Sequence, residues 1–467
     1  MLRLTFLGAN RQVTGSCYAL DAAGLRVLVD CGLYQEREYQ GRNWEPTPVD
    51  VPALAAVLLT HAHLDHCGLL PKLAREGFAG PVHATPPTIE LARLVLEDAA
   101  RIQAEDVAYK KKRHQREGRV GPHPYVPLYT EEDVAAIAAR MRPLGYEAPL
   151  ALGADVRACF HDAGHILGSA MVEVSAPARG GTRSVLFSGD LGQPAVPIVR
   201  DPARVRRADY VVIESTYGNR DHQHRSEIDD QLADAVRTAV GRGGSVLIPT
   251  FAIERAQELM LHLAELLDAG RIPRVPVYLD SPMAVDATEI FARHRDYMDA
   301  PTRAAFAGGR FTRARGWLSL VRTREDSKEI DAARGSAIVL AGSGMCTGGR
   351  IKHHLAQQIE RPETLVLFSG YQARGTLGRE ILDGRKEVRI LGRMRVVRAE
   401  VRQIWGLSAH AGRDDLLAWL GGFEAPPRRL FVTHGEEEAS LAFAEAVRSA
   451  LGWDVRVPVY GESLELD

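Results

Sequence analysis

The sequence predicts an α/β protein of two domains, the second inserted into the first. Residues 1–217 alternate between short strand and helix patterns, and residues 218–404 change to repeated units of strand, glycine-containing loop and helix. Residues 405–467 then return to the first domain and complete it. A chain of 467 residues with 45% hydrophobic content is long enough for two domains, or for one domain with a large insertion. We therefore place the inserted domain at 218–404.

Composition and cysteine usage favour a cytoplasmic protein. The chain starts directly with an apolar strand pattern at Leu2–Leu7, without a charged-then-apolar leader, and contains no run of about 18 apolar residues. Its five cysteines are scattered and never form a CxxC pair, which predicts reduced thiols. The net charge of −2 provides no overall attraction for a polyanion. Any nucleic-acid binding must therefore come from local basic patches.

The most informative stretch runs from His61 to His66. It places three histidines and Asp65 within six residues, directly after the apolar run Val57–Leu59, which predicts a buried strand. Side chains two residues apart on an extended segment project to the same face, so His61 and His63 can bind one metal together. Asp65 and His66 follow where the chain should turn into a helix, and they can reach a second metal. Imidazole suits zinc, and a carboxylate adds an oxygen ligand. The alternative is a polar loop of hydrogen-bonded histidines.

Three further polar residues follow predicted strands, where a rigid sheet usually presents functional groups. His165 lies in a glycine-bounded turn between Val156–Phe160 and a predicted strand at Ala170–Val174. Asp190 follows another predicted strand, and His434 stands at the end of an apolar run. Any one of these residues alone is more often a capping or core residue. Together they supply the ligands that would close two metal sites.

The insertion contains four apolar runs, each followed by a helical pattern. These pairs are 245–249 with 254–267, 276–280 with 284–293, 337–341 with 349–358, and 364–368 with 376–382. Such alternation predicts a doubly wound, mainly parallel sheet. In the first domain the sequence also predicts a helix over 88–112 and a polar, charge-rich stretch over 97–132 that interrupts the regular elements.

The metal motifs resemble those of the metallo-β-lactamase superfamily in order and character. The resemblance implies an αββα sandwich that holds two zinc ions (Zn²⁺) at its edge. It also implies that Asp30, within Leu28–Gly32, orients the ligand loop by hydrogen bonding. The implied ligands of one zinc are His61, His63, His165 and Asp190, and those of the other are Asp65, His66, His434 and the bridging Asp190.

Two further segments narrow the resemblance to the β-CASP nucleases. Ile213–Gly218, with Glu214, and Gly406–Ala411, with His410, look like motifs A and B of that family, and His434 stands at motif C. The family includes ribonuclease J and the endonuclease subunit of pre-mRNA 3′-end processing, and the Ser-Ala-His form of motif B points to the latter. Members with a histidine at motif C act on RNA, whereas DNA-repair members carry valine there. A helix-capping acid and a solvated histidine are the alternatives for Glu214 and His410.

This resemblance implies a zinc-dependent ribonuclease that cuts RNA internally, with 5′-to-3′ exonuclease activity as an additional mode. The expected products carry 3′-hydroxyl and 5′-phosphate ends. His410, oriented by Glu214, is expected to protonate the leaving 3′ oxygen, and Asp65 to take part in catalysis as well as metal binding. Three alternatives are a DNA nuclease or other phosphodiesterase, a thiolester hydrolase of the glyoxalase II type, and a non-catalytic scaffold. The large insertion argues against the thiolester hydrolase, and the complete ligand set argues against the scaffold.

Loops of the inserted domain carry candidate RNA-binding residues. The glycine-rich loop Gly342–Arg350 lies between a predicted strand and helix, so Ser343, Gly344 and the backbone amides can cradle a phosphate. Tight packing of a β–α turn explains this loop equally well. Tyr371 offers a ring for base stacking, with a packed turn tyrosine as the alternative.

A basic segment follows that tyrosine. Arg374 and Arg379 begin a run of basic residues that continues to Arg402, and we expect it to contact the RNA backbone. A second cluster at Lys110–Arg113 is more simply explained as a solvated helix face. The expected partner is single-stranded RNA. Whether the protein forms a homodimer, and which RNA it cuts, are left open by the sequence.

Overall fold

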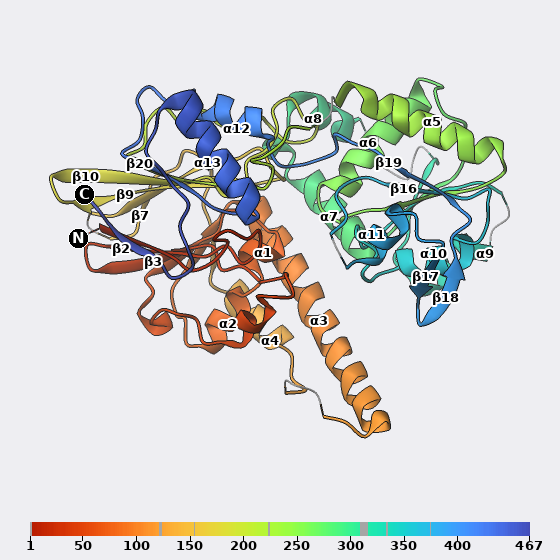
Figure 1. Cartoon of the computed structure of the whole chain (residues 1–467), viewed down its shortest axis with the longest axis horizontal. Coiled ribbons are helices and arrows are strands. Elements are labelled where there is room, and N and C mark those ends of the chain that lie inside the picture. Colours follow the sequence, from red (N-terminus) through yellow and green to blue (C-terminus); the bar gives the residue numbers. More distant parts are fainter. Residues whose placement is uncertain are drawn as a thin grey trace. The chain divides into compact units, whose positions relative to one another are not determined.

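The computed structural model describes residues 2–120, 124–153, 155–222, 225–308, 316–332, 335–373 and 375–467 (Figure 1). These residues form two compact units. The first unit contains residues up to Asp221 together with His410–Asp467, and the second contains His222–Ala409. Within the described part of the chain, no helix is both long and apolar enough to cross a membrane.

The first unit is built around a pair of sheets. From edge to edge, the N-terminal sheet contains β22 (Ser463–Leu466), β1 (Leu2–Phe6), β2 (Tyr18–Ala22), β3 (Leu25–Val29), β4 (Ala56–Leu58), β5 (Val82–Ala84) and β6 (Met141–Pro143). The central sheet contains β21 (Val455–Arg456), β20 (Arg429–Val432), β11 (Tyr210–Ile213), β10 (Gly181–Phe187), β9 (Ala170–Ala178), β8 (Arg157–Asp162) and β7 (Leu150–Ala151). Short 3₁₀ turns lie at Gln40–Trp44 and Val51–Ala53.

The two sheets pack face to face with helices on their outer sides (Figure 1). Alternate strand residues point inward, so that Leu4 of the N-terminal sheet and Phe160 of the central sheet share one core. The helices beside the N-terminal sheet are α1 (Leu64–Cys67), α2 (Leu70–Arg75), α3 (Pro86–Glu117) and α4 (Glu131–Ala138). The outer face of the central sheet is covered by α12 (Arg413–Leu420) and α13 (Glu437–Leu451), whose Leu416 and Phe443 pack against Met171. The predicted αββα sandwich is confirmed.

Helix α3 is longer than predicted. It begins after Thr85, whose hydroxyl accepts a hydrogen bond from the Thr88 amide at 3.3 Å, and it ends at Gly118, which has a φ of 61°. The predicted helix over 88–112 is confirmed, and it continues to Glu117 within the polar stretch at 97–132. The residues there are mainly Ala, Glu, Lys, Gln and Arg, which have high intrinsic helix propensity. The helix therefore continues although its second half is largely exposed.

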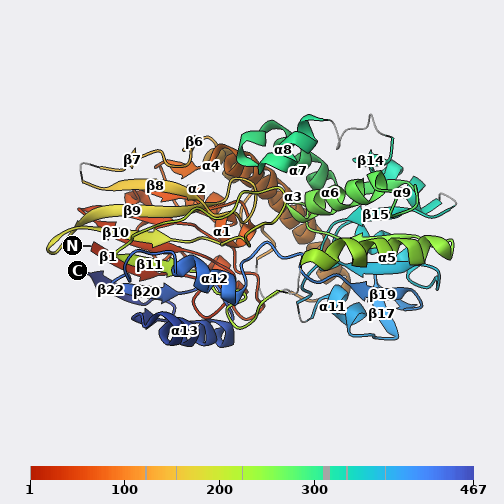
Figure 2. The same cartoon turned by 90° about the horizontal axis from the view of Figure 1, so that it is seen from above.

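The second unit is organised around a parallel sheet, seen from above in Figure 2. From edge to edge its strands are β14 (Leu318–Leu320), β13 (Val277–Asp280), β15 (Ile338–Ala341), β12 (Val246–Pro249), β16 (Leu365–Phe368) and β19 (Glu400–Gln403). Neighbouring strands all pair in parallel. Every residue of β12, β15 and β16 is buried, as expected for a parallel sheet covered by helices on both faces. The predicted doubly wound sheet is confirmed.

The remaining elements of this unit connect or flank the parallel strands. The helices are α5 (Ile228–Gly241), α6 (Arg255–Asp268), α7 (Pro282–Arg293), α8 (Ala300–Ala307), α9 (Arg324–Ala332), α10 (Ile351–Gln358) and α11 (Leu377–Leu382). Short 3₁₀ turns lie at Arg225–Glu227 and Arg295–Tyr297, and a hairpin is formed by β17 (Glu387–Ile390) and β18 (Arg393–Val396). Strand order reverses at β12, because β13 and β14 lie on one side of it and β16 and β19 on the other. Loops at the carboxyl ends of strands beside such a reversal commonly bind ligands.

A buried polar network ties α10 to the end of β13. His354 places Nε2 2.7 Å from Asp280 Oδ2 and Nδ1 2.8 Å from Asp331 Oδ1. Asp280 also pairs with Arg350 and accepts a hydrogen bond from Ser327 at 2.6 Å. Burial lowers the pKa of His354, but the hydrogen bonds to Asp280 and Asp331 outweigh it and raise this pKa to about 9. His354 is therefore a protonated, paired group at neutral pH.

This network predicts a pH-dependent contribution to stability. The unfolded pKa of histidine is about 6.5, so the contribution is fully present below that pH and is lost as pH rises through the folded pKa of about 9. His354→Gln should flatten the fall in unfolding free energy between these two pH values, as measured by urea denaturation. His353→Gln, at the exposed neighbouring position, is the matched control and should keep the wild-type slope. Equal slopes in wild type and His354→Gln would contradict the assignment.

Candidate metal centre

The predicted metal ligands of the first unit converge at the ends of its strands. His61 and His63 lie between β4 and α1, and Asp65 and His66 lie on α1. The others stand in loops: His165 between β8 and β9, Asp190 after β10 and His434 after β20. Among the described residues, potential ligand atoms of His61, His63, His165 and Asp190 lie within 4.8 Å of one another, and those of Asp65, His66 and His434 form another such group.

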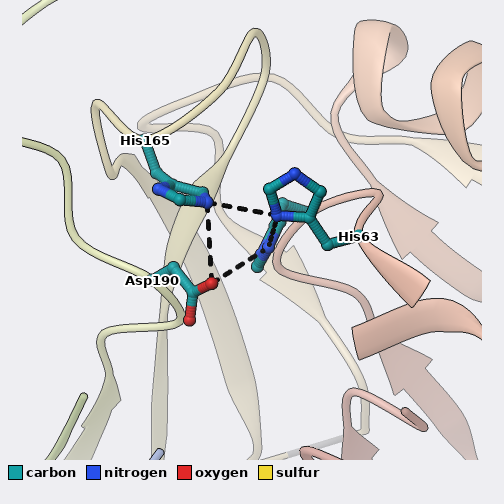
Figure 3. Close-up of side chains that lie close together, drawn as sticks. His63, His165 and Asp190 are labelled. Atoms are coloured by element: carbon teal, nitrogen blue, oxygen red, sulfur yellow. Dashed lines mark hydrogen bonds and ion pairs between the residues drawn. The ribbon is translucent and has the colours of Figure 1, made fainter. Parts of the chain in front are cut away.

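The first group has the spacing of a four-ligand zinc site. His63 Nδ1 lies 3.1 Å from His61 Nε2 and 3.2 Å from His165 Nε2. Asp190 Oδ2 lies 3.3 Å from His61 Nε2 and 3.5 Å from His165 Nε2. Figure 3 shows His63, His165 and Asp190 pointing toward one another. Ligands about 2.0–2.1 Å from a tetrahedral ion stand about 3.3–3.4 Å apart, so these four atoms fit one zinc ion.

The second group shares Asp190 with the first. His66 Nε2 lies 3.1 Å from His434 Nε2 and 3.2 Å from Asp190 Oδ1. His434 Nε2 lies 3.5 Å from Asp65 Oδ2. Asp190 Oδ1 is buried and has no hydrogen bond of good geometry among the described residues, its neighbours being His66 Nε2 at 3.2 Å and His434 Nδ1 at 3.5 Å. Because a buried carboxylate oxygen normally has a partner, this oxygen is well suited to a cation. The two oxygens of Asp190 thus face different histidine groups.

The protonation states of the histidines differ between the groups. Burial lowers the pKa of His61 to about 3 and also lowers the pKa of His63 and His165, so their imidazoles are neutral. Neutral imidazole is the form that binds metal. Burial also lowers the pKa of His66, but the negative charges of Asp190 and Asp30 more than compensate and raise it well above the ordinary value. A proton therefore balances these carboxylates, and a bound metal ion would replace it.

Asp30 lies directly behind this loop. Its Oδ2 lies 2.7 Å from His66 Nδ1, and its Oδ1 accepts a hydrogen bond of 2.8 Å from the Thr60 amide. The Thr60 hydroxyl donates to Asp30 Oδ2 at 2.8 Å and lies 3.1 Å from His61 Nδ1. These contacts turn His66 Nε2 toward Asp190 and His434. They have the form expected of a residue that orients metal ligands through hydrogen bonds.

Close backbone contacts hold the ligand loops in place. A Cβ on Gly32 would lie 1.6 Å from the Asp65 carbonyl oxygen, and a Cβ on Gly192 would lie 1.7 Å from the Gly164 carbonyl oxygen. Only glycine permits either approach. Asp30 and His434 themselves adopt left-handed backbone conformations, with φ of 60° and 49°. Such conformations in residues other than glycine concentrate at functional sites.

Glu214 and His410 form a pair next to Asp190. His410 Nδ1 lies 3.1 and 3.2 Å from the two Glu214 oxygens, and 4.0 Å from Asp190 Oδ2. The Leu191 amide donates to Glu214 Oε1 at 2.7 Å, which fixes the carboxylate. The His410 side chain is 21% exposed, whereas that of Glu214 is fully buried. Burial lowers the pKa of His410, but Glu214 and then Asp190 raise it to about 9. His410 is thus a protonated group that reaches the surface.

Several supporting hydroxyl groups were not predicted from the sequence. Thr60 links Asp30 to the first histidines, Thr216 Oγ1 lies 3.1 Å from His434 Nδ1, and Ser169 Oγ accepts a hydrogen bond from the His165 amide at 3.0 Å. Each stands within a few residues of a motif histidine or glutamate. A serine or threonine close to a motif histidine or glutamate was therefore the feature of the sequence that could have identified these residues.

The predicted RNA-binding residues belong to the second unit. Ser343 and Gly344 follow β15, and Tyr371 follows β16, so both loops lie at the carboxyl edge of the sheet. Gln372 joins them, since its Nε2 donates to the Gly344 carbonyl at 3.0 Å. Arg379 lies on α11 and pairs with Asp383. Arg374 lies outside the described residues.

Phe251 is an exposed aromatic that the sequence analysis missed. It follows β12, the strand between β15 and β16, and its ring lies 2.7 Å from where a Cβ on Gly344 would stand. Phe251 is 47% exposed and Tyr371 is 43% exposed. An aromatic residue just after a buried strand was the signal in the sequence. Aromatic rings that remain exposed at such loop positions can stack on bases.

Sequence comparison gives three family matches. Residues 10–250 match the metallo-beta-lactamase superfamily, residues 256–381 the Beta-Casp domain, and residues 395–458 the Zn-dependent metallo-hydrolase RNA specificity domain. The chain is also 41% identical over 463 residues to ribonuclease TTHA0252 of Thermus thermophilus, covering 99% of this chain and 100% of that protein. The chain belongs to the β-CASP branch of the metallo-β-lactamase superfamily. This confirms the family that the motifs resemble and the predicted class of hydrolytic nuclease.

Two further relatives are transcription termination factors. Transcription termination factor FttA of Methanosarcina mazei is 33% identical, with 100% of this chain and 72% of that protein covered. FttA of Methanocaldococcus jannaschii is also 33% identical, with coverage of 98% and 70%. A solved structure of a protein of unknown function from Enterococcus faecalis has a TM-score of 0.55 at 12% identity, and the match covers 100% of both chains. That likeness supports the fold alone.

Proposed function

We propose that this protein is a ribonuclease that uses two zinc ions to hydrolyse phosphodiester bonds of single-stranded RNA, leaving 3′-hydroxyl and 5′-phosphate ends. The observation that carries the proposal is Asp190, whose Oδ2 faces His61 and His165 while its Oδ1 faces His66 and His434. A carboxylate placed between two histidine groups is the arrangement that a pair of metal ions requires. The RNA preference is supported by the ribonuclease relative and by the RNA specificity domain match.

Each zinc ion is assigned four protein ligands. His61, His63, His165 and Asp190 would hold one, and Asp65, His66, His434 and the shared Asp190 would hold the other. When bound, such a pair lowers the pKa of water and neutralises charge on the phosphoryl oxygens. Asp30 and Thr60 keep the imidazoles aligned for this purpose.

His410 is the proposed general acid. Its Nδ1 faces Glu214, so the proton transferred to the leaving 3′ oxygen is the one on Nε2. Glu214 is a positioning residue, because it is buried and acts through His410. Burial raises the pKa of Asp65, but the hydrogen bond with His434 and the nearby His66 outweigh it and lower this pKa. Asp65 therefore remains a carboxylate that can orient the attacking water.

RNA binding is proposed to involve the carboxyl edge of the inserted sheet. Phe251 and Tyr371 would stack on bases, while the Ser343–Gly344 loop would contact a phosphate. Arg374 and Arg379 are proposed to contact the backbone. The cytoplasmic location and the homodimer remain predictions.

Loss of the aromatic rings should weaken RNA binding. Each stacked base contributes about 1–3 kcal/mol, so Phe251→Ala and Tyr371→Ala should each raise the Kd for single-stranded RNA by about 5- to 150-fold. Fluorescence anisotropy with an end-labelled oligonucleotide measures this change. Tyr109→Ala, on the exposed half of α3, is the matched control and should leave the Kd unchanged. An unchanged Kd in both test variants would remove these rings from the RNA-binding surface.

A comparison of cleavage rates on three substrates tests the proposed function as a whole. The zinc-loaded protein is incubated separately with RNA, with DNA of the same sequence and with a small thiolester, and initial rates are compared. RNA should be cleaved fastest. Its binding should weaken steeply with salt, with a log–log slope of about 0.7 for each neutralised phosphate. Faster turnover of DNA or of the thiolester would overturn the proposal.

A further inference from the structure

A cluster of cysteine, histidine and glutamate side chains lies on the central sheet, outside the groups described above. Cys159 and His161 stand two residues apart on β8, and Glu173 pairs with Cys159 on β9. The residues between them, such as Phe160, face the sandwich core, so these three side chains lie on the opposite face. Glu147, in the segment before β7, completes the cluster.

The contacts bring sulfur, nitrogen and oxygen atoms together. His161 Nδ1 lies 2.8 Å from Glu147 Oε1, and His161 Nε2 lies 3.1 Å from Glu173 Oε2. Potential ligand atoms of Glu147, Cys159 and His161 all lie within 4.8 Å of one another. Cys159, His161 and Glu147 therefore offer one thiol, one imidazole and one carboxylate in a small volume, while Glu173 contacts the other nitrogen of the imidazole.

The charges of the cluster favour a cation. Burial raises the pKa of the Cys159 thiol, and Glu147 and Glu173 raise it further. For His161, burial lowers the pKa, but the hydrogen bonds to Glu173 and Glu147 raise it above the ordinary value. The contributions of Glu147 and Glu173 to both shifts reflect a locally negative potential. Glu147 is held there with a φ of 59°, while its amide donates to the Phe160 carbonyl at 2.8 Å.

We propose that Cys159, His161 and Glu147 form an additional binding site for a zinc-like divalent ion, and that Glu173 orients the imidazole through its other nitrogen. A thiolate with an imidazole suits zinc, and the Glu147 carboxylate together with a water molecule can complete four-coordination. Binding releases the thiol proton of Cys159 and the proton that His161 shares with the carboxylates. Ligand atoms of such a site stand about 3.3–3.8 Å apart, so the contact of 2.8 Å between His161 Nδ1 and Glu147 Oε1 must lengthen slightly. Glu147 can move for this purpose, because its side chain is 66% exposed.

The site would stiffen the loop that carries His165. Tyr146, the neighbour of Glu147, donates its hydroxyl to the Ser169 carbonyl at 2.8 Å. Ser169 in turn accepts the His165 amide through its hydroxyl at 3.0 Å. An ion bound by Glu147 and by residues of β8 would therefore hold the neighbouring Tyr146 in place. Tyr146 would in turn stabilise Ser169 and the backbone of His165. The proposed role is structural support beside the metal centre.

Cobalt provides a selective test, because the groups of the metal centre contain only nitrogen and oxygen ligands. The full-length protein is stripped of metal with a chelator and titrated with Co²⁺. Wild type should develop thiolate-to-cobalt charge-transfer absorption in the near ultraviolet. Cys159→Ser should lack this absorption and bind one equivalent fewer, and Glu147→Gln should weaken it. Cys346→Ser, which changes a buried cysteine of the other unit, should keep it.

Folding and activity are checked on the same samples. Far-ultraviolet circular dichroism and RNA cleavage should match wild type in Cys159→Ser, since Cys159 is outside the catalytic machinery. If Cys159→Ser fails to fold, the Glu147→Gln titration decides the question, because that side chain is mostly exposed. Absence of thiolate absorption in wild type would overturn the proposal and leave only a histidine paired with two glutamates. Absorption that persists in Cys159→Ser, or that is undiminished in Glu147→Gln, would also overturn it.

Discussion

Replacing Asp190 by alanine is expected to reduce RNA cleavage to an undetectable rate and to weaken both metal sites. The reason is that Oδ2 of this carboxylate faces one histidine group and Oδ1 faces the other. His63→Ala should be more selective, because His63 belongs to the first group alone. It should remove the zinc of that group and abolish cleavage while the second group keeps its ligands.

Elemental analysis of the purified variants, together with cleavage rates, measures this difference. Asp454→Ala is a suitable control, since Asp454 is an exposed carboxylate of the same unit that pairs with Arg429. It should retain wild-type zinc and wild-type rate. Undiminished zinc and an unchanged rate in Asp190→Ala would show that Asp190 is not a bridging ligand.

Replacing His410 by alanine should lower the cleavage rate by at least about a hundredfold, the usual effect of a general acid. Zinc content should be unchanged, because His410 faces Glu214 and lies at 4.0 Å from the nearest Asp190 oxygen. The two measurements together separate proton transfer from metal binding. Loss of zinc from His410→Ala would instead make His410 a ligand.

The pH profile provides a second readout of the same pair. The pKa of His410 is raised to about 9, so the rate should fall as pH rises through this value and the donor loses its proton. Glu214→Gln removes the negative charge that most raises this pKa. The alkaline limb of its profile should therefore move to lower pH, whereas a purely structural loss would lower the rate equally at every pH.

The metal ligands were predictable from the sequence where a short spacing along the chain determines their relative positions. His61 and His63 lie two residues apart after a strand, and an extended backbone places such side chains together. Asp65 and His66 were expected at a helix start, and α1 begins at Leu64. The meeting of His165, Asp190 and His434 depends on the order of strands in one sheet, where β9 joins β8 to β10 and β11 joins β10 to β20. Periodicity cannot reveal this, and only the family resemblance predicted it.

Other features depended on contacts that no local pattern encodes. Thr60 supports the metal ligands only because Asp30, which follows β3, lies within hydrogen-bond distance of it. The exposure of Phe251 depends on which strands lie next to β12. The end of helix α3 was predicted at 112 instead of Glu117, because the polar residues there give no apolar periodicity to mark it. By contrast, the strands of the insertion were predicted well, since parallel strands buried on both faces form continuous apolar runs.

The proposed activity of this protein is hydrolysis of RNA at a pair of zinc sites joined by Asp190. The most direct measurement incubates zinc-loaded wild type and Asp190→Ala with one RNA labelled in turn at its 5′ and 3′ ends, and identifies the product termini. Wild type should yield fragments with 3′-hydroxyl and 5′-phosphate ends from both labelled substrates, and Asp190→Ala should yield none. Release of mononucleotides alone from the 5′ label would indicate that cleavage proceeds only from that end. Intact RNA with wild type, fragments with 2′,3′-cyclic phosphate ends, or equal cleavage by Asp190→Ala would contradict the account.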